Sequence, residues 1–403
     1  MSTTATPTSL RNVRVWNGGE TDAVDLHFAN GQITTVSPAA PGSPSDADGI
    51  DGIDGIDGRG LLALPGLVNT HAHVDKSWWG HPWESYGGEG GTEGRIRHER
   101  DRRDALGIPS VEITSRVLAE LVRHGTTAIR THVDVDPGIG VRGIEAVREA
   151  ASAYGGALRL ELVAFPQDGV LRRPGVLDLL AEAARSGVEH IGGLDPASID
   201  RDPVGQLDAI FALAAEHGTG IDIHLHDPAE LGLFQFELIV ARTEALGLQG
   251  RVNVAHGFAL AQAGDSRRRD LLQAMAALEI SMTTVAPLRL AQLPLHEMDA
   301  AGVRFGFGTD GIRDLWSPYG TGDLLGIAWQ YARSSGIVRD ADLARVVDIA
   351  AGGSLTVGGA STGLRAGDRA DVVLVDAENP MDALVRTPRR ELVLGGGQVL
   401  HRE

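Results

Sequence analysis

The sequence predicts an α/β protein: a (β/α)8 TIM barrel with a small β-sandwich domain formed from the N- and C-terminal segments. Three observations carry this prediction. Short apolar segments alternate with amphipathic helical segments in eight repeats between residues 67 and 361, which is typical of a parallel barrel. Short strand-like segments without such helices lie at both ends, in residues 1–66 and 362–403. The length of 403 residues fits a barrel with a smaller companion better than one ordinary domain.

The N-terminal segment is predicted to form short strands joined by tight turns. Asn17-Gly18-Gly19 and Asn30-Gly31 are turn signals, and Asn-Gly in particular favours a hairpin. The strands that these turns separate are predicted at 13–16, 25–28 and 32–36. Residues 40–58 are rich in Pro, Ser, Asp and Gly, and we interpret them as a surface loop.

The central part of the chain is predicted to supply the eight strands of the barrel. These strands are expected at 68–74, 126–135, 158–166, 189–194, 220–226, 251–256, 279–286 and 303–308. Amphipathic helices are expected between most of them, at 111–124, 141–153, 175–186, 205–217 and 268–278. A doubly wound open sheet is the alternative, but it predicts a glycine-rich dinucleotide turn after the first strand, and the sequence has none there.

The C-terminal segment returns to short strands, at 370–375 and 391–394, followed by the turn Gly395-Gly396-Gly397. The simplest assembly pairs these strands with the N-terminal ones. We therefore expect one β-domain from residues 1–66 plus 362–403, with the barrel of residues 67–361 inserted between its halves.

Composition excludes several classes of function. The formal net charge is -18, which argues against nucleic acid or an anionic membrane surface as a partner, since both require a basic face. The chain has no cysteine, so neither a disulfide nor a thiolate nucleophile is possible. No secretory signal and no run approaching about 18 apolar residues is present, so we expect a cytoplasmic protein that acts on a small molecule.

Polar residues follow several of the predicted barrel strands where each strand ends. His71 and His73 end the first strand, and because side chains at i and i+2 share a face, both can approach one ion. His224 ends the fifth strand, His256 the sixth and Asp310 the eighth. Active sites of such barrels collect at the carboxyl ends of the strands, so these five side chains are expected to converge.

The chemistry of this set favours a metal ion. Imidazole and carboxylate ligands suit zinc or iron(II), with one position left open for water. A bound ion lowers the pKa of that water toward about 7 and so supplies a hydroxide nucleophile at neutral pH. The sequence therefore predicts a metal-dependent hydrolase.

The order of these motifs resembles the amidohydrolase superfamily across essentially the whole chain. Within it, the segment 163–169 (VAFPQDG) is similar to the cytosine deaminase branch. The sequence also resembles the N-isopropylammelide isopropylaminohydrolases, which act on an s-triazine ring. That second resemblance rests on HVDK at 73–76, THVDVD at 131–136, HLHD at 224–227 and DGIRDLW at 310–316.

The resemblance implies a deaminase that removes an amino or alkylamino group from a pyrimidine- or triazine-like ring by attack of a metal-bound hydroxide. It implies that the metal is held by His71, His73, His224 and Asp310, and that His256 hydrogen-bonds the attacking hydroxide. Asp310 is also expected to accept a proton from that hydroxide. The alternative is an amidohydrolase that cleaves a cyclic or exocyclic amide, and a less favoured one is a non-enzymatic relative kept for assembly. A homo-oligomer is expected from the resemblance as well.

Two residues compete for the transfer of protons. The deaminase branch uses His-x-x-Glu after the fifth strand, with the glutamate as acid and base, whereas this chain has His224-x-x-Asp227. Either Asp227 reaches the substrate with its shorter side chain, or His226, on the same face as His224, takes over the task. A purely structural role for Asp227, capping the segment that begins at Pro228, is the alternative for that residue.

Three further residues are expected to bind the substrate. By resemblance Gln167 binds the ring, because an amide offers both a donor and an acceptor. Lys76 is the sole lysine among 36 basic side chains, which indicates a close-packed place that requires a compact ammonium, facing a ring carbonyl or an acidic substituent. Trp316 is a candidate stacking surface, with ordinary packing as its alternative.

The metal centre is expected to hold one divalent ion, zinc or iron. Binuclear relatives bridge their ions with a carbamylated lysine on the fourth strand, and the lone Lys76 follows the first strand instead. Asp195, after the fourth strand, is a poor bridge. One departure concerns the substrate: cytosine deaminases carry a second aspartate after the metal aspartate, and this chain has Gly311. This favours a larger or differently substituted ring than cytosine, in a pocket that Trp78, Trp79 and Trp83 could line within a lid at 77–100.

Overall fold

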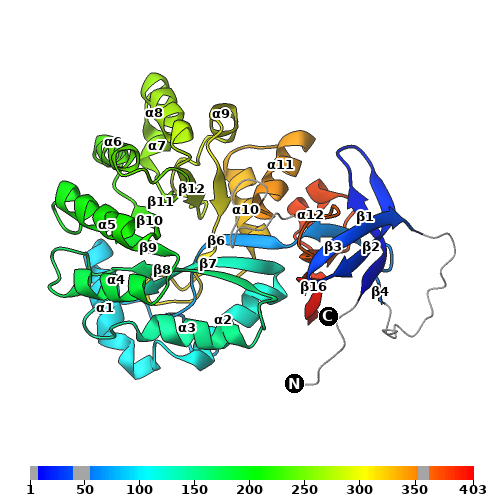
Figure 1. Cartoon of the computed structure of the whole chain (residues 1–403), viewed down its shortest axis with the longest axis horizontal. Helices are drawn as coiled ribbons and strands as arrows, with labels where there is room; N and C mark the ends of the chain where they lie inside the picture. Colours follow the sequence, from blue (N-terminus) through cyan, green and yellow to red (C-terminus); the bar gives the residue numbers. More distant parts are fainter. Residues whose placement is uncertain (1–7, 40–54, 353–362) are drawn as a thin grey trace.

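The computed structural model describes residues 8–39, 55–352 and 363–403, and its strands form two sheets (Figure 1). One sheet is parallel and comes from the middle of the chain. The other combines strands from the two ends of the chain. The two-part organisation of strands that the sequence predicted is therefore visible in the pairing of the strands.

The central sheet has nine parallel strands in the order β13-β12-β11-β10-β9-β8-β7-β6-β14. Their bounds are β6 Leu67–His73, β7 Thr126–Asp134, β8 Arg159–Phe165, β9 His190–Leu194, β10 Gly220–Leu225, β11 Val252–His256, β12 Ser281–Thr284, β13 Phe305–Phe307 and β14 Asp310–Gly311. The eight predicted strands are confirmed, each within two residues at either end.

The sheet curls so that its last strand returns to its first. β13 pairs with β12, whereas β14 pairs with β6 at the opposite edge, with Asp310 beside Ala72 and Gly311 beside His73. The two residues between β13 and β14 carry the chain from one edge to the other. This pairing brings Asp310 directly beside the strand that carries His71 and His73.

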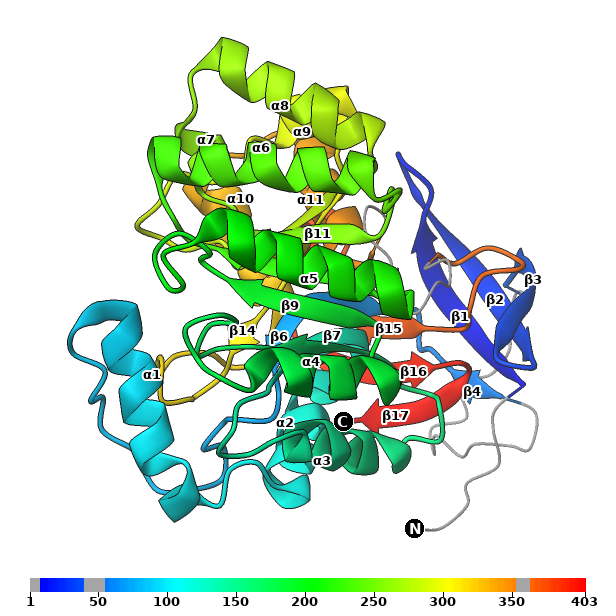
Figure 2. The ribbon, with the colours of Figure 1, turned by 60° about the vertical axis from the view of Figure 1, so that its left-hand side comes forward.

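Most helices between the central strands pack along the outer side of the curled sheet, whereas α1 lies apart at one end of the molecule (Figure 2). Their bounds are α1 Gly91–Arg102, α2 Val111–Arg123, α3 Arg142–Ser152, α4 Val176–Arg185, α5 Pro203–His217, α6 Ala229–Ala245, α7 Ala259–Gln262, α8 Asp265–Ala277, α9 Leu295–Ala301, α10 Leu324–Ser334, α11 Asp340–Ala350 and α12 Pro380–Arg386, with a 3-10 turn at Asp104–Leu106. The five predicted helices are confirmed as α2, α3, α4, α5 and α8.

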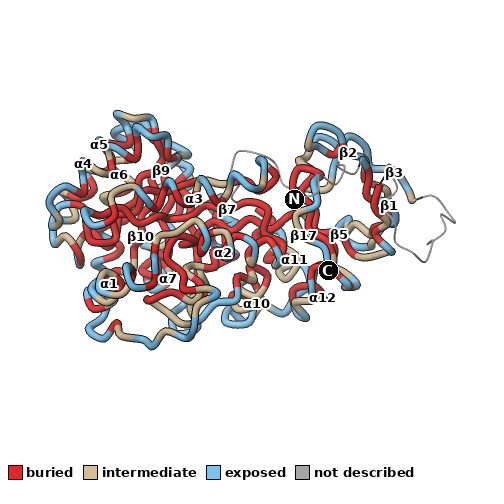
Figure 3. Tube along the Cα trace, turned by 90° about the horizontal axis from the view of Figure 1, so that it is seen from below, coloured by how far each residue is buried: buried red, intermediate tan, exposed pale blue. Residues whose placement is uncertain are grey.

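The first of these outer helices, α2, illustrates why they form. Its buried residues include Ile113, Val117 and Leu121, which recur every four residues and so lie on one face of the helix. Ser110 precedes the helix and its side chain accepts a hydrogen bond from the backbone N–H of Ile113, which satisfies one of the free amides at the helix start. The apolar face therefore packs inward, and Figure 3 shows the buried residues concentrated in the interior.

The two ends of the chain meet in an eight-stranded sheet with the order β17-β16-β15-β5-β1-β2-β3, in which β4 also pairs with β1. Its strands are β1 Ser9–Trp16, β2 Thr21–Ala29, β3 Gln32–Pro38, β4 Ile56–Asp57, β5 Leu62–Pro65, β15 Val372–Val375, β16 Arg390–Gly395 and β17 Gln398–Arg402. The antiparallel pairing of β5 with β15 confirms that the two ends join. Hydrogen bonds connect these strands in one sheet, so the two-layer sandwich stays a prediction.

Two sequence expectations concern loops. Of the predicted surface loop 40–58, residues 40–54 lie outside the described residues, and Ile56–Asp57 forms β4 rather than loop. The segment 77–100, interpreted as a loop or lid, includes most of helix α1. This helix escaped prediction because its residues Gly91–Arg102 carry charge on nearly every face and show no apolar periodicity. In Figure 2, α1 lies at the opposite end of the molecule from β1–β3.

Within the described residues, no helix combines the length and the apolar character that crossing a membrane requires.

Candidate metal centre and active-site cavity

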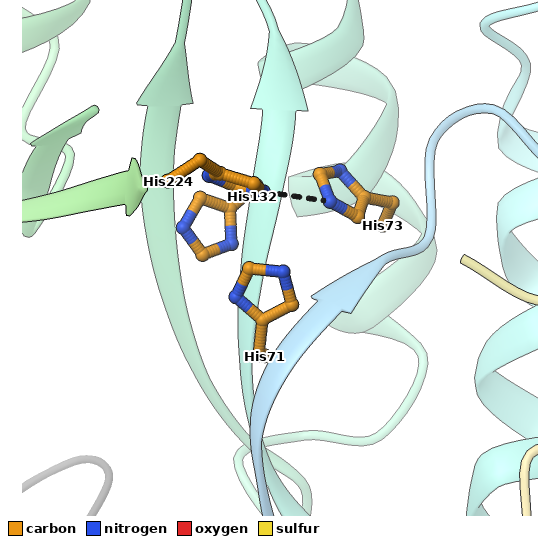
Figure 4. Close-up of side chains that lie close together, drawn as sticks. All are labelled: His71, His73, His132 and His224. Atoms are coloured by element: carbon orange, nitrogen blue, oxygen red, sulfur yellow. Dashed lines mark hydrogen bonds between the residues drawn. The ribbon is translucent and has the colours of Figure 1, made fainter. Parts of the chain in front are cut away.

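A cluster of histidines lies at the carboxyl ends of the central strands. His71 and His73 come from β6, His132 from β7 and His224 from β10, and Figure 4 shows their imidazole rings pointing toward one another. One ligand atom from each of these four lies within 4.8 Å of the others. A second set with the same spacing joins His71 to His256, the last residue of β11, and to Asp310. The structure thus brings together the five residues that the sequence placed at strand ends.

The distances between these donors suit one ion. His224 Nε2 lies 3.2 Å from His73 Nε2, and His73 Nε2 lies 3.4 Å from Asp310 Oδ1. His71 Nε2 lies 3.7 Å from the same carboxylate oxygen. Tetrahedral zinc with bonds of about 2.1 Å holds its ligand atoms about 3.4 Å apart. The donor spacing is therefore that of side chains able to share one divalent ion.

The same cluster contains buried nitrogens without a hydrogen-bond partner among the described residues. These atoms are Nδ1 and Nε2 of His71, Nδ1 of His73, Nδ1 of His224, and both ring nitrogens of His132 and His256. Buried polar atoms are nearly always satisfied, so a group of unsatisfied ones demands an explanation. A bound cation would provide it for those nitrogens that face the centre of the cluster.

The electrostatics of the cluster favour the protonation states that ligands require. Burial is the main reason that the pKa values of His73, His224 and His256 lie well below the ordinary value, and the crowding of the histidines adds to this effect. Burial acts to raise the pKa of Asp310, but the nearby imidazoles of His71 and His73 outweigh it and hold that pKa well below its usual range. Neutral imidazoles and an ionised carboxylate are the forms that bind metals.

Backbone conformation is unusual at the same place. His256 has φ 69°, Asp310 has φ 60° and Asp195 has φ 33°, all in the left-handed region that side chains other than glycine rarely adopt. Such conformations cost about 1–3 kcal/mol each and cluster at functional sites, where the surrounding structure holds them. Their coincidence here marks the rim of the strands as the functional end of the sheet.

His132 belongs to the cluster although it was not among the site residues predicted from the sequence. Its ring centroid lies 4.3 Å from that of His71, and burial lowers its pKa to about 4. Beneath it, Asp222 lies 3.4 Å from Nε2 and also accepts hydrogen bonds from Arg130 at 3.2 Å and Asn253 at 2.9 Å. The available signal was its position near the end of a predicted strand, the same signal that identified His224.

A cavity of about 620 Å³ opens beside the cluster. The predicted site residues that line it are His73, Lys76, Gln167, His224, His226, His256, Asp310 and Trp316. His71 is fully buried behind them. Trp78, Trp79 and Trp83 are not among the residues that line the cavity, so the expectation that these tryptophans widen it was wrong. Trp78 is instead a packed residue, 1% exposed, with its ring against Trp83.

The two candidates for proton transfer have different surroundings. His226 lines the cavity, stacks on His256 at 4.2 Å between ring centroids, and bonds through Nδ1 to Asp195 Oδ2 at 2.9 Å. Asp195 Oδ1 also accepts the backbone N–H of His226 at 2.5 Å. Burial lowers the pKa of His226, but Asp195 and other carboxylates outweigh it and raise the pKa above its ordinary value. Asp195 thus fixes the imidazole ring of His226 through Nδ1, and Nε2 is the ring nitrogen that this bond does not use.

Asp227 is not among the residues that line the cavity. One of its oxygens accepts a hydrogen bond from the hydroxyl of Ser198, and the other accepts one from Gln235 Nε2 at 2.9 Å. Only 4% of the residue is exposed. Its carboxylate therefore joins the loop after β9 to helix α6, and the structure does not bring it to the other candidate residues.

Lys76 lies at the centre of a buried polar group. Its Nζ donates to Asp134 Oδ1 at 2.9 Å and to Gln167 Oε1, and lies 3.9 Å from Glu99 Oε2. Burial alone would lower the pKa of Lys76, but Asp134 and Glu99 outweigh it and raise the pKa above its ordinary value. Trp316 Nε1 donates to Glu99 Oε2 at 2.6 Å. The group fixes Gln167 and Trp316, the two other expected substrate contacts.

Gly311 lies next to Asp310, and the space beside it is filled. A Cβ atom at Gly311 would overlap Oδ2 of Asp314. The other oxygen of Asp314 accepts the backbone N–H groups of Trp316 and Ser317, each at 2.8 Å. Asp314 lines the cavity, so a carboxylate already stands where a side chain at 311 would begin. The glycine therefore does not by itself enlarge the cavity.

We expect Gly311→Ala to lower the free energy of unfolding by about 1–3 kcal/mol, because the added methyl group displaces the anchored carboxylate of Asp314. In the double variant Gly311→Ala with Asp314→Ala the overlap is gone, so urea denaturation should give a loss smaller than the sum of the two single losses. Gly264→Ala is the matched control, since a Cβ there meets no atom within 4 Å. Strictly additive losses would contradict this account.

Comparison with known proteins relates the chain to enzymes. Residues 109–401 match the model described as the amidohydrolase family. The chain is 31% identical over 346 residues to the uncharacterized protein YahJ of Escherichia coli (strain K12), covering 85% of this chain and 75% of that protein. It is 27% identical over 376 residues to N-isopropylammelide isopropyl amidohydrolase of Pseudomonas sp. (strain ADP), covering 86% and 87%. The solved structure of N-isopropylammelide isopropylaminohydrolase from Burkholderia multivorans is 36% identical, with a TM-score of 0.89 over 98% of both chains.

Proposed function

The chain belongs to the amidohydrolase family, and on that premise we propose that it is a deaminase of nitrogen heterocycles. The proposed reaction replaces an amino or alkylamino group on a pyrimidine- or triazine-like ring by a carbonyl oxygen from water, with release of ammonia or a free amine. Two relatives named for N-isopropylammelide support this substrate class. The alternative is hydrolysis of a cyclic or exocyclic amide, which the same fold would permit.

The observation that carries the proposal is the contact between the cavity and the histidine cluster. The cavity of about 620 Å³ is lined by His73, His224 and Asp310 on one side and by Gln167 and Trp316 on another. Ligand donors and ring-binding groups therefore face one space. This arrangement is suited to holding a ring carbon beside a metal centre.

We propose that His71, His73, His224 and Asp310 hold one divalent ion, zinc or iron, and that His132 lies beside them with Asp222 fixing its ring. When bound, the ion would lower the pKa of a water ligand and so supply the nucleophile at neutral pH. The spacing of the donors and their unsatisfied nitrogens support this assignment. The lowered pKa values of His73 and His224 support it as well, since protonated imidazoles cannot bind a cation.

The proton is proposed to move through His226. Deamination requires that the departing nitrogen be protonated. A histidine side chain is suited to that transfer, because histidine ordinarily gains and loses its proton near neutral pH. His226 lines the cavity with its Nδ1 fixed by Asp195, so Nε2 is the nitrogen that can receive and deliver the proton. His256, stacked on His226, would hydrogen-bond the attacking oxygen. Asp310 would ligate the ion and accept a proton, while Asp227 keeps its structural contacts.

Substrate orientation is proposed to come from three groups that the structure ties together. Gln167 would bind an N–C=O edge of the ring through its amide, and Lys76 would bind a ring carbonyl. The indole of Trp316 would stack on the ring. Their shared anchoring through Asp134 and Glu99 supports a rigid binding surface, which lowers the entropy cost of binding.

We propose the same division of the chain that the sequence predicted, with residues 67–361 as a (β/α)8 barrel and residues 1–66 plus 362–403 as a β-sandwich domain. The pairing of β14 with β6 supports closure of the barrel. A separate set of buried apolar residues supports the second domain, with Leu10, Leu26 and Ile33 from the N-terminal part and Val372 and Leu394 from the C-terminal part.

The test couples metal analysis to product analysis. We expect about one zinc or iron per chain by plasma mass spectrometry, and release of ammonia or an alkylamine from one class among cytosine, isocytosine, aminopyrimidines, aminotriazines, purines and pterins. His224→Ala should lose both metal and turnover, because it removes a ligand. His296→Ala is the control, since this histidine is exposed and belongs neither to the cluster nor to the residues that line the cavity.

Two results would contradict the proposal. Two ions per chain would oppose the mononuclear centre. A ring-opened acid as product, with no amine released from any ring, would assign the chain to the amide-cleaving alternative.

A further inference from the structure

We propose that Arg95 recognises an anionic substituent, so that the preferred substrate is a heterocycle bearing a carboxylate. This inference rests on the proposed function, because it concerns the same cavity. It begins from helix α1, which lies over the functional end of the molecule and contributes Thr92 and Arg95 to the cavity lining.

The position of Arg95 places its charge beside the proposed stacking surface. Its guanidinium carbon lies 5.9 Å from the ring centroid of Trp316, and both side chains line the cavity. The Trp316 ring is held at its edge by the bond from Nε1 to Glu99, which belongs to the same helix. A ring stacked on Trp316 would therefore carry its substituents within reach of the guanidinium.

No carboxylate of the described residues forms an ion pair with the guanidinium of Arg95. Its recorded polar contact is a long one, from Nε to the hydroxyl of Tyr86 at 3.5 Å, and no carboxylate of the described residues lies within 4.0 Å of it. Three other arginines at the end of α1 are all paired. These pairs are Arg100 with Asp168, Arg102 with Glu84, and Arg103 with Asp136.

The second cation of the cavity does not compete for the same role. Lys76 is buried against Asp134 and Glu99, so its charge is compensated within the protein. Arg95 therefore carries the uncompensated positive charge that the lining presents to a ligand. In a chain with a net charge of -18, the long-range field repels anions, so recognition of one requires such a local cation.

The chemistry of the group points to a carboxylate. Guanidinium presents parallel N–H donors in a planar fork that matches the two oxygens of a carboxylate. With a neutral ring bound, the N–H donors of the guanidinium would hydrogen-bond only to water and would not contribute to the binding affinity. A substrate with a carboxylate next to the stacked ring would use it fully.

The experiment compares matched substrates and matched variants. Turnover and calorimetric binding are measured for cytosine against 5-carboxycytosine and for isocytosine against its 5-carboxylate, in the metal-loaded full chain. The variants are Arg95→Gln and Arg97→Gln. Arg97 lies on the same helix and also lacks a recorded ion pair, but it is exposed and is not among the cavity-lining residues.

We expect the carboxylate member of a pair to bind more tightly, and Arg95→Gln to weaken its binding by about 10- to 100-fold through KM, the range of a charge-assisted hydrogen bond. The neutral member should be unaffected, and Arg97→Gln should match the wild type on both. Equal binding of the two members, or equal effects of the two variants, overturns the inference. Loss of carboxylate binding in Arg95→Gln without amine release from any ring supports the inference while contradicting the deaminase proposal.

Discussion

Replacement of His226 by Asn is expected to lower turnover by about 100- to 10,000-fold, the contribution of a positioned acid–base group. The fold should persist, because 37% of this side chain is exposed and its backbone N–H still donates to Asp195. Steady-state kinetics on the best substrate of the screen measure the loss, and metal content must stay at the wild-type value for the comparison to hold.

Asp227→Asn is the matched control for that experiment. Its carboxylate accepts hydrogen bonds from Ser198 and Gln235, so an amide in its place loses one acceptor and weakens the link between these residues. The cost should therefore appear in thermal stability, with kcat within a few-fold of wild type. Asp195→Asn should lower kcat through misorientation of the His226 ring. A loss of kcat in Asp227→Asn as large as in His226→Asn would reverse the assignment of the proton carrier.

Asp222→Leu is expected to lower the free energy of unfolding by about 3–5 kcal/mol, because the buried guanidinium of Arg130 loses one of its carboxylate partners. Asp222 is 0% exposed, accepts hydrogen bonds from Arg130 and Asn253, and lies 3.4 Å from Nε2 of His132. Urea denaturation of the metal-free chain measures the effect. Metal affinity, determined by competition with a chelator, should fall by about 10- to 100-fold in the milder Asp222→Asn, because the carboxylate that positions His132 beside the four proposed ligands is removed.

Asp208→Asn provides the comparison for the stability measurement. Asp208 also pairs with an arginine, Arg242, at 2.7 Å, but 63% of its side chain is exposed. Such surface pairs contribute at most about 1 kcal/mol. If the two aspartates cost the same on replacement, the buried group beneath His132 does not have the structural role assigned to it.

Most strands of the central sheet and the main residues of the candidate site could be predicted from the sequence. Parallel strands buried on both sides are continuous apolar runs, and their carboxyl ends are marked by the polar residue that interrupts each run. This pattern is the reason that the sequence alone predicts His71, His73, His224, His256 and Asp310 as site residues. The helices with a single apolar face were equally accessible.

The other features of the site depend on side-chain orientations and long-range contacts that cannot be read from the sequence pattern. His226 and Asp227 are neighbours in the chain, but their contacts differ. His226 faces the cavity and bonds to Asp195, whereas Asp227 is held by Ser198 and Gln235. His132 lies in the segment THVDVD at 131–136, but that pattern alone does not distinguish a histidine of the cluster from one packed in the sheet. Helix α1 is held by long-range ion pairs rather than by an apolar face, so periodicity could not reveal it.

The place where the curled sheet returns on itself has a thermodynamic consequence. β14 pairs with β6 through two residue positions, and the side chains at that seam include Asp310 from one strand and His73 from the other. An ion coordinated by both residues would stay bound only while the seam remains intact, so it favours the closed arrangement by mass action. The apparent stability of the chain is then a function of free metal concentration. Depletion of the ion would weaken the seam and the active site together.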